Sequence, residues 1–283
     1  MLIYYGSFAY FIYIFLALGF CALMYFLFRK KSDFAKRALV LSLSSINLLQ
    51  HLFKSLIYPQ YRGDGFSYLG SAYNMCAFLI IISPFVMLSG SSLMRDFITF
   101  IGTVAGAIAI IVPFWFIGQS AFQWEAYRFY ICHTLLFSSS LLPSILGLHK
   151  LKFKNFAKIG FVFLLALAVI LVNDIVFISL GLYPGRDINN LFGSLSDLNP
   201  CWCMHPPAIF RWLSDIICAL SPKIFLSSGQ KPYTPILWYA LPMYVFITVI
   251  AFIISAICDK DGFSEFLSKS KSIFIKIKSK FKK

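Results

Sequence analysis

Long apolar stretches recur along the whole sequence, and they limit the folds that this chain can adopt. Each is about 20 residues long, the length that an α-helix needs to cross roughly 30 Å of hydrocarbon. Seven such windows can be drawn, at 4–28, 37–58, 69–89, 97–117, 128–148, 156–181 and 236–257. Because hydrocarbon offers the backbone no hydrogen-bond partner, such segments must be helices. The sequence therefore predicts an all-α, polytopic membrane bundle of about seven transmembrane helices, with six as an alternative.

The scarcity of charge supports this prediction. Only 13% of the 283 residues are charged, whereas soluble domains carry roughly 25%. This is too little charge to coat a water-facing surface. We therefore expect a multi-pass protein of the cell membrane, and a bacterial source fits the residue usage.

The basic residues indicate the orientation of the bundle, because they gather in alternate connections. They follow the first window (Arg29, Lys30, Lys31, Lys36 and Arg37), the third (Arg95) and the fifth (Lys150, Lys152, Lys154 and Lys158), and they fill the tail from Lys260 to Lys283. Basic connections stay in the cytoplasm. We therefore expect the N-terminus outside and the C-terminus inside, with a bundle at 1–258 that includes an outward loop at 182–235.

The tail at 259–283 is basic, and on a helix its apolar residues fall roughly on one side. Such a segment is predicted to bind the anionic lipids of the inner leaflet. The alternative is a disordered tail that serves only as a topology signal. Because topology already explains the positive charge, no nucleic-acid partner is predicted.

A layer of polar residues is predicted in the outer half of the bundle. At about 1.5 Å per residue, these groups lie roughly 6–12 Å below the outer boundary. They are Gln50, His51, Lys54, Asn74, His133, Asn173 and Asp174. The inner halves carry almost no ionisable groups. Ionisable residues at such depth cost about 2.5–3.5 kcal/mol each and usually face a bundle interior or a wet cavity.

We therefore predict a polar cavity that opens toward the outer leaflet, in which Lys54 and Asp174 form an ion pair. Two alternatives stay open. Lys54 can extend its amine to the membrane surface, and a membrane histidine can serve only as an interhelical hydrogen-bond partner. Histidine beside a hydroxyl or thiol supports acyl transfer. The nearby candidate nucleophiles are Cys76, Cys132, Ser71, Tyr73 and Thr134, and spacing does not choose among them.

Several stretches resemble a known family. They are "YNMCAFLIIISPFVMLSGSSLMRDFITFIGTVAGAIAI", "YRFYICHTLLFSSSLL", "NDIVFISLGLYPGRDINNLFGSL" and "SGQKPYTPILWYALPMYVF". Over most of residues 40–255 the pattern is similar to the YwaF-like bacterial integral membrane proteins. Through them it is similar to the vertebrate transmembrane ether-phospholipid acyltransferases and, more distantly, to the androgen-induced membrane lipid hydrolases.

This resemblance implies a helical bundle whose substrate is a membrane phospholipid or acyl chain, with His133 as the catalytic base and Arg128 five residues before it. The family usually shows Leu-Pro-Leu-His-x-Cys on its third helix. Here Asn74 takes the place of that histidine and Cys76 that of the cysteine. Asparagine can donate to an oxyanion but cannot act as a base. A member without activity is therefore an alternative.

The outer loop contains "CWCMH", in which Cys201, Cys203 and His205 are metal-type ligands. Zinc sites favour wider cysteine spacing and a fourth ligand. A disulfide of Cys201 or Cys203 with Cys218, and free thiols in a reducing setting, are the alternatives. No metal or cofactor is predicted. Two further functions compete with acyl chemistry: a transporter or ligand sensor that uses the same cavity, and a structural or assembly factor.

Overall fold

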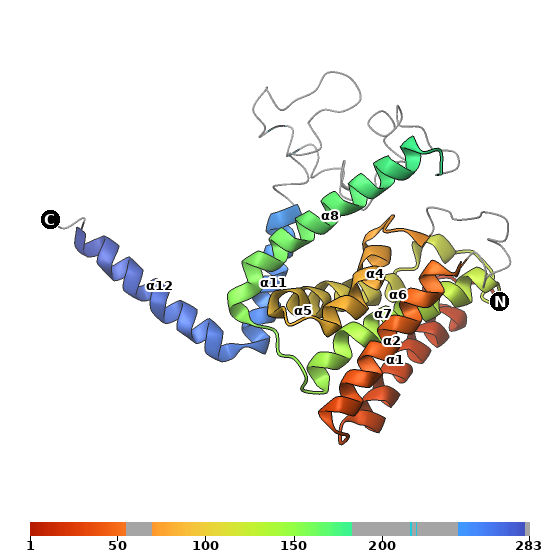
Figure 1. The fold of residues 1–283 in the computed structure, drawn as a ribbon, viewed down its shortest axis with the longest axis horizontal. Helices are drawn as coiled ribbons and strands as arrows, with labels where there is room; N and C mark the ends of the chain where they lie inside the picture. Colours follow the sequence, from red (N-terminus) through yellow and green to blue (C-terminus); the bar gives the residue numbers. More distant parts are fainter. Residues whose placement is uncertain (55–69, 183–215, 217–218, 220–242, 281–283) are drawn as a thin grey trace.

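The computed structural model describes residues 1–54, 70–182, 216, 219 and 243–280 of the chain, and this part is helical. Its helices are α1 (Phe8–Phe28), α2 (Asp33–Leu52), α4 (Met75–Leu88), α5 (Ser92–Phe97), the π-helix η3 (Ile98–Gly102), α6 (Thr103–Ile111), α7 (Trp124–Ile145), α8 (Phe156–Ser179), α11 (Tyr244–Cys258) and α12 (Lys260–Lys280). Figure 1 shows their arrangement. The only β pairing among the described residues is an isolated bridge between Leu2 and Ser120. The predicted all-α class is confirmed for this part.

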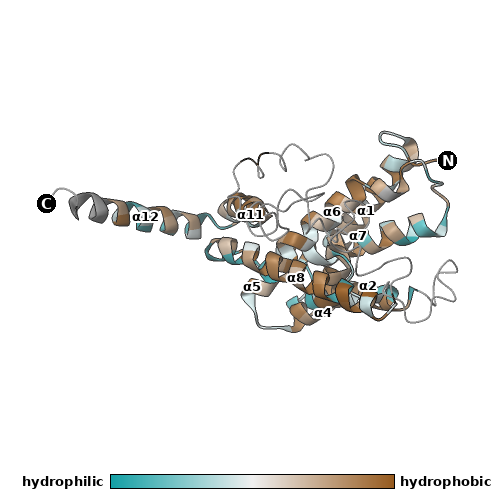
Figure 2. Ribbon diagram, turned by 90° about the horizontal axis from the view of Figure 1, so that it is seen from above, coloured by the Kyte–Doolittle hydropathy of each residue, from teal (hydrophilic) through white to brown (hydrophobic). Residues whose placement is uncertain are grey.

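Among the described residues, three helical segments are long and apolar enough to cross a membrane: Phe8–Phe28, Ser92–Ile111 and Phe153–Ser179. Two shorter apolar helices, α4 and α11, accompany them. Figure 2 shows the hydrophobic colouring that covers much of α1, α6, α8 and α11. A multi-pass membrane protein is therefore plausible from length and composition, while α2 and α7 are less apolar than these five.

Serine side chains set where three helices begin, and two of these starts differ from the predicted windows. Ser7 accepts a hydrogen bond from the backbone of the first turn of α1, and Ser32 and Ser91 do the same for α2 and α5. Such caps satisfy backbone N–H groups that have no partner within the helix. The second and fourth windows therefore start too late, at 37 and 97, because apolarity alone does not mark a capped polar start. The second window also runs past Leu52, and its residues 55–58 lie outside the described part.

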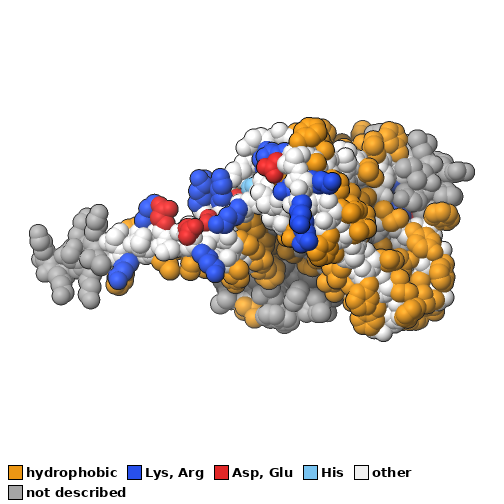
Figure 3. Space-filling model, turned by 90° about the horizontal axis from the view of Figure 1, so that it is seen from below, with side chains coloured by type: hydrophobic (Ala, Val, Ile, Leu, Met, Phe, Trp, Pro, Cys, Tyr) orange, Lys and Arg blue, Asp and Glu red, His pale blue; other side chains and the backbone are white. Residues whose placement is uncertain are grey.

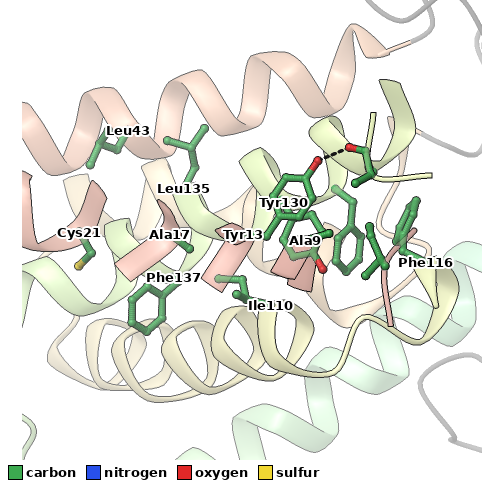
Figure 4. Close-up of a cluster of buried hydrophobic side chains, with 14 of the residues drawn as sticks. Ala9, Tyr13, Ala17, Cys21, Leu43, Ile110, Phe116, Tyr130, Leu135 and Phe137 are labelled. Carbon is green, nitrogen blue, oxygen red and sulfur yellow. Dashed lines mark hydrogen bonds between the residues drawn. The ribbon is translucent and has the colours of Figure 1, made fainter. Parts of the chain in front are cut away.

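Helix α7 is central, because α1, α2 and α6 all pack against it. The rings of Tyr13 on α1 and Tyr130 on α7 stack with centroids 3.9 Å apart, within the cluster drawn in Figure 4. Gly106 lets α6 approach closely, since a Cβ atom there would lie 2.8 Å from the backbone nitrogen of Phe137. A second buried cluster joins α4, α5, η3, α8 and α11.

Helix α12 extends away from the other helices (Figure 1), and an aromatic cluster anchors its first turns. The ring of Phe153 lies 5.2 Å from that of Phe263 and 5.4 Å from that of Phe266. The carboxylate of Asp259 accepts the backbone N–H of Phe153 at 2.9 Å. This bond holds the pKa of Asp259 below its ordinary value. The described part of the tail is thus helical, and binding of the tail to anionic lipid stays a prediction.

Candidate functional site

Asn47, on the polar face of α2, forms a hydrogen bond to α7. The side-chain amide of Asn47 donates to the backbone carbonyl of Cys132 at 3.0 Å, and Gln50 donates to Asn47 at 2.5 Å. Asn47 is buried, with 2% of its surface exposed. The i, i+3 spacing on the helix places both amides on one face, so this face of α2 lies against α7 rather than against lipid.

One turn further on, α2 holds the segment that precedes α4. The imidazole of His51 donates through Nε2 to the backbone carbonyl of Ser71 at 3.0 Å. The amine of Lys54 lies over the ring of Tyr73, 4.8 Å from its centroid. Cation–π contact of this kind stabilises an ammonium group away from water, and only 2% of Lys54 is exposed.

Helix α8 reaches the same segment from the other side. The amide of Asn173 donates to the hydroxyl of Ser71 at 3.0 Å and to the carboxylate of Asp174 at 3.2 Å. Asp174 is buried, with 4% exposed. We call His51, Lys54, Ser71, Tyr73, Asn173 and Asp174 the polar cluster. Ser71 connects its two halves, since its carbonyl faces α2 and its hydroxyl faces α8.

From α7, Arg128 and His133 are the candidate contributors. Arg128 forms an ion pair with Glu125 and interacts electrostatically with Lys54 and His51. His133 is buried, its Nδ1 lies 2.7 Å from the carbonyl of Phe129, and its ring packs on that of Phe129 at 4.2 Å. Because a carbonyl can only accept, Nδ1 carries the proton, and Nε2 is the acceptor in the neutral ring.

Asn74 has a different position from the predicted one. The third window places it inside a helix that begins near residue 69, but α4 begins at Met75 and Asn74 is its N-cap. The side-chain oxygen of Asn74 accepts the N–H of Ala77 at 2.9 Å. Asparagine favours this position because its oxygen satisfies a helix-end N–H. Cys76 lies in the first turn of the same helix and is partly buried.

The predicted ion pair between Lys54 and Asp174 is also wrong. Lys54 lies on the ring of Tyr73 instead, and Asp174 accepts from Asn173. The reason is geometric, because the segment before α4 lies between the ends of α2 and α8 and bonds to both. Of the predicted residues, the structure brings His51, Lys54, Asn173 and Asp174 around one segment, with Arg128 in electrostatic reach. No hydrogen bond joins His133 to the described members of the polar cluster.

A second polar group contradicts the expectation of inner halves almost free of ionisable residues. Asp96 on α5 is fully buried, and its carboxylate accepts from Nε2 of His149 at 2.7 Å and from the amide of Asn155 at 2.6 Å. The predicted window begins at residue 97, so Asp96 falls in its preceding loop. The Ser91 cap is the sequence signal that would have placed Asp96 inside a helix.

Other predicted groups lie outside the described part of the chain. These are Cys201, Cys203, His205 and nearly all of the loop at 182–235. Within the described ranges, no group of three or more His, Cys, Asp and Glu side chains is placed to hold a metal ion.

Comparisons with known proteins found no relative of this chain. No family model, curated protein or solved structure matches the chain.

Proposed function

We propose that this chain is a multi-pass protein of the cell membrane with its N-terminus outside and its C-terminus in the cytoplasm. Seven helical segments form the spans: α1, α2, α4, Ser92–Ile111, α7, α8 and α11. The less apolar α2 and α7 pack among the others, which shields their polar faces from lipid. Lys and Arg side chains gather on the face drawn in Figure 3, and basic residues favour the cytoplasmic side.

Within this bundle, the polar cluster binds the polar head of a membrane phospholipid or acyl-chain substrate. The observation that carries this proposal is the burial of His51 on α2, Lys54 just after α2 and Asp174 on α8 around one segment. Buried ionisable groups are costly in a membrane and are rarely kept without a function. A buried ammonium with an arginine in electrostatic reach is suited to an anionic group such as a phosphate or carboxylate.

The chemistry we assign to the site is acyl transfer or hydrolysis, with His133 as the general base. Its Nδ1 proton is held by the carbonyl of Phe129, so Nε2 can take the proton of an attacking hydroxyl, thiol or water. The resemblance to YwaF-like proteins and to the ether-phospholipid acyltransferases supports the same residue. Cys76, which takes the place of the cysteine in the family pattern, is one of the candidate nucleophiles beside Cys132, Ser71, Tyr73 and Thr134.

A second candidate function is ligand binding or transport without chemistry. Asn74 favours it, because its side-chain oxygen caps α4 at the position where the family carries a catalytic histidine. The lack of a hydrogen bond between His133 and the described members of the polar cluster favours it as well. On this view, the same cluster binds a solute or lipid and releases it unchanged.

One experiment separates these functions. Protein in nanodiscs is given a fluorescent phospholipid, and acyl release and equilibrium binding are measured for the unaltered chain, His133→Ala and Lys54→Met. Acyl chemistry predicts that His133→Ala abolishes turnover and leaves binding intact. The binding function predicts no turnover and a loss of binding in Lys54→Met. Ser45→Ala, on a part-buried position of α2, is the control. Equal binding and equal turnover in all four proteins would exclude both functions.

The orientation has its own test. In a chain whose seven native cysteines are replaced by alanine, Lys152→Cys should react with a membrane-impermeant thiol reagent only after the cells are opened. Labelling from outside intact cells contradicts the proposed topology.

A further inference from the structure

A groove lies at the opposite end of the bundle from the polar cluster's helix ends, between α2, α4, α5 and the end of α7. Its volume is about 430 Å³. Its walls are mainly apolar and include Phe34, Val40, Leu41, Met87, Leu88 and Pro143. Three polar side chains also line it: Arg37, Arg95 and His149. None of the described residues that line the groove is acidic, so it presents positive charge beside apolar surface.

The positive charge of the groove is not neutralised within the described part of the chain. Arg37 is exposed, and neither it nor Arg95 forms an ion pair with a described acid. The guanidinium of Arg95 donates to the backbone carbonyl of Ser89, which positions its head group and leaves further N–H donors. A guanidinium binds phosphate through paired N–H donors. Two of them at one groove therefore make a site for a phosphate group.

The third polar side chain of the groove, His149, is held in place by a buried hydrogen-bond network. The imidazole of His149 is fixed by the fully buried carboxylate of Asp96, which Asn155 also contacts. This network joins α5 to the connection between α7 and α8. The wall of the groove next to Arg95 is thus held by packing and hydrogen bonds, as a preformed binding site requires.

We propose that this groove binds the phosphate head of one anionic phospholipid of the cytoplasmic leaflet, such as phosphatidylglycerol. Arg37 and Arg95 contact the phosphate, while an acyl chain lies along the apolar wall. The choice of a lipid over free phosphate follows from the walls, because Phe34 and Leu88 expose 83% and 69% of their surface beside the arginines. A soluble anion makes no use of that surface. The inference rests on the proposed orientation only for the choice of leaflet.

Native mass spectrometry of the full chain in detergent tests the proposal, with phosphatidylglycerol and phosphatidylcholine as probes. The unaltered protein should retain phosphatidylglycerol and release phosphatidylcholine. Arg37→Gln and Arg95→Gln should each weaken retention about tenfold, the value typical for one charge-assisted hydrogen bond. Lys30→Gln with Lys31→Gln is the matched control, because it removes two positive charges of the same connection outside the groove.

A second pair of variants tests the groove without removing either arginine, so the result does not depend on whether the arginine variants fold. Ala38→Trp fills the groove and keeps both arginines, whereas Ser42→Trp adds the same bulk to an exposed position of α2 outside the groove. Loss of phosphatidylglycerol in the first and retention in the second supports the site. Equal retention in all groove variants, equal loss in the lysine control, or displacement by millimolar inorganic phosphate overturns it. His133→Ala and Lys54→Met should retain this lipid, so failure of the proposed function is distinguishable.

Discussion

His149 and Asp96 are 53 residues apart in the sequence, yet Nε2 of the histidine lies 2.7 Å from a carboxylate oxygen of the aspartate. The other carboxylate oxygen accepts from Asn155. Together these bonds fix the start of the Ser92–Ile111 segment against the connection that leads to α8. A buried acid with both oxygens bonded is a strong constraint on that packing.

Asp96→Ala should lower the free energy of unfolding by about 3 kcal/mol, because it leaves His149 and Asn155 without their buried partner. SDS titration in mixed micelles measures the change. Asp33→Ala is the control, since the side chain of Asp33 is 75% exposed and pairs only with Lys36. It should change stability by no more than about 0.5 kcal/mol. Equal losses in the two variants would refute the structural role of the buried pair.

Gly106→Ala should destabilise the bundle by about 1–3 kcal/mol. The added Cβ atom would lie 2.8–2.9 Å from the backbone of Phe137, and backbone cannot move aside as a flexible side chain does. Gly19→Ala is the matched control, because no atom lies within 4 Å of its Cβ position in α1. The control should be neutral or gain up to about 1 kcal/mol from helix propensity. The same denaturant titration compares them, and a stable Gly106→Ala protein would show that α6 and α7 are not in close contact.

The docking of α12 should depend on pH through Asp259. Its carboxylate has a lowered pKa, chiefly because it accepts the N–H of Phe153. A lowered pKa in the folded state means that the stabilisation is present above the ordinary value near 3.8 and is lost as the pH falls through the lowered value. In a chain whose seven native cysteines are replaced by alanine, spin labels at Lys152→Cys and Ser270→Cys should therefore give a narrow distance distribution at pH 7 and a broad one in strong acid.

Asp259→Asn should remove that pH dependence, since an amide does not titrate in this range. Glu265→Gln is the control. Glu265 also has a lowered pKa, from its hydrogen bond to Lys269, but it bonds only within α12 and should leave the docking unchanged. A pH response that survives Asp259→Asn would assign the effect to another group.

Asn47→Ala should weaken the contact between α2 and α7 by about 1 kcal/mol, a typical value for an interhelical hydrogen bond in a membrane bundle. The bond from its amide to the carbonyl of Cys132 is lost. Thermal unfolding in detergent, followed by intrinsic fluorescence, measures the change. Ser45→Ala changes a part-buried residue of the same helix that bonds to neither partner, and its midpoint should stay within about 1 °C of the unaltered chain. A similar fall in both would mean that α2 tolerates no substitution here.

The sequence predicted the helices best where apolarity alone decides them. Windows 4–28 and 156–181 differ from α1 and α8 by only a few residues, because apolar residues make up most of both helices. The predicted start of α2 was wrong, since Ser32 and Asp33 make a polar but well-capped beginning. A hydropathy average over a window hides two polar residues at a helix start, whereas the preference of serine and aspartate for the N-terminal end of a helix would have located that start.

The sequence predicted which residues lie together at the candidate site better than it predicted which of them contact each other. Depth along each helix placed His51, Lys54, Asn173 and Asp174 at one level, and the structure gathers them around residues 71–73. Which side chains bond to each other depends on helix rotation and on the path of the connecting segment. Apolar periodicity encodes neither, so the contact of Lys54 with Tyr73 and the capping role of Asn74 were missed.

The π-helical turn at Ile98–Gly102 has a consequence for sequence change in this protein. A π turn holds one residue more than an α turn, so the segment accommodates an extra residue without a loop. All five of its residues are buried. Deleting one of them would leave an ordinary α turn of nearly the same angle, because the wider turn absorbs the added residue. Gly106 would keep facing Phe137, whereas the same deletion between Thr103 and Gly106 would turn that glycine by about 100° and remove the close contact of α6 with α7.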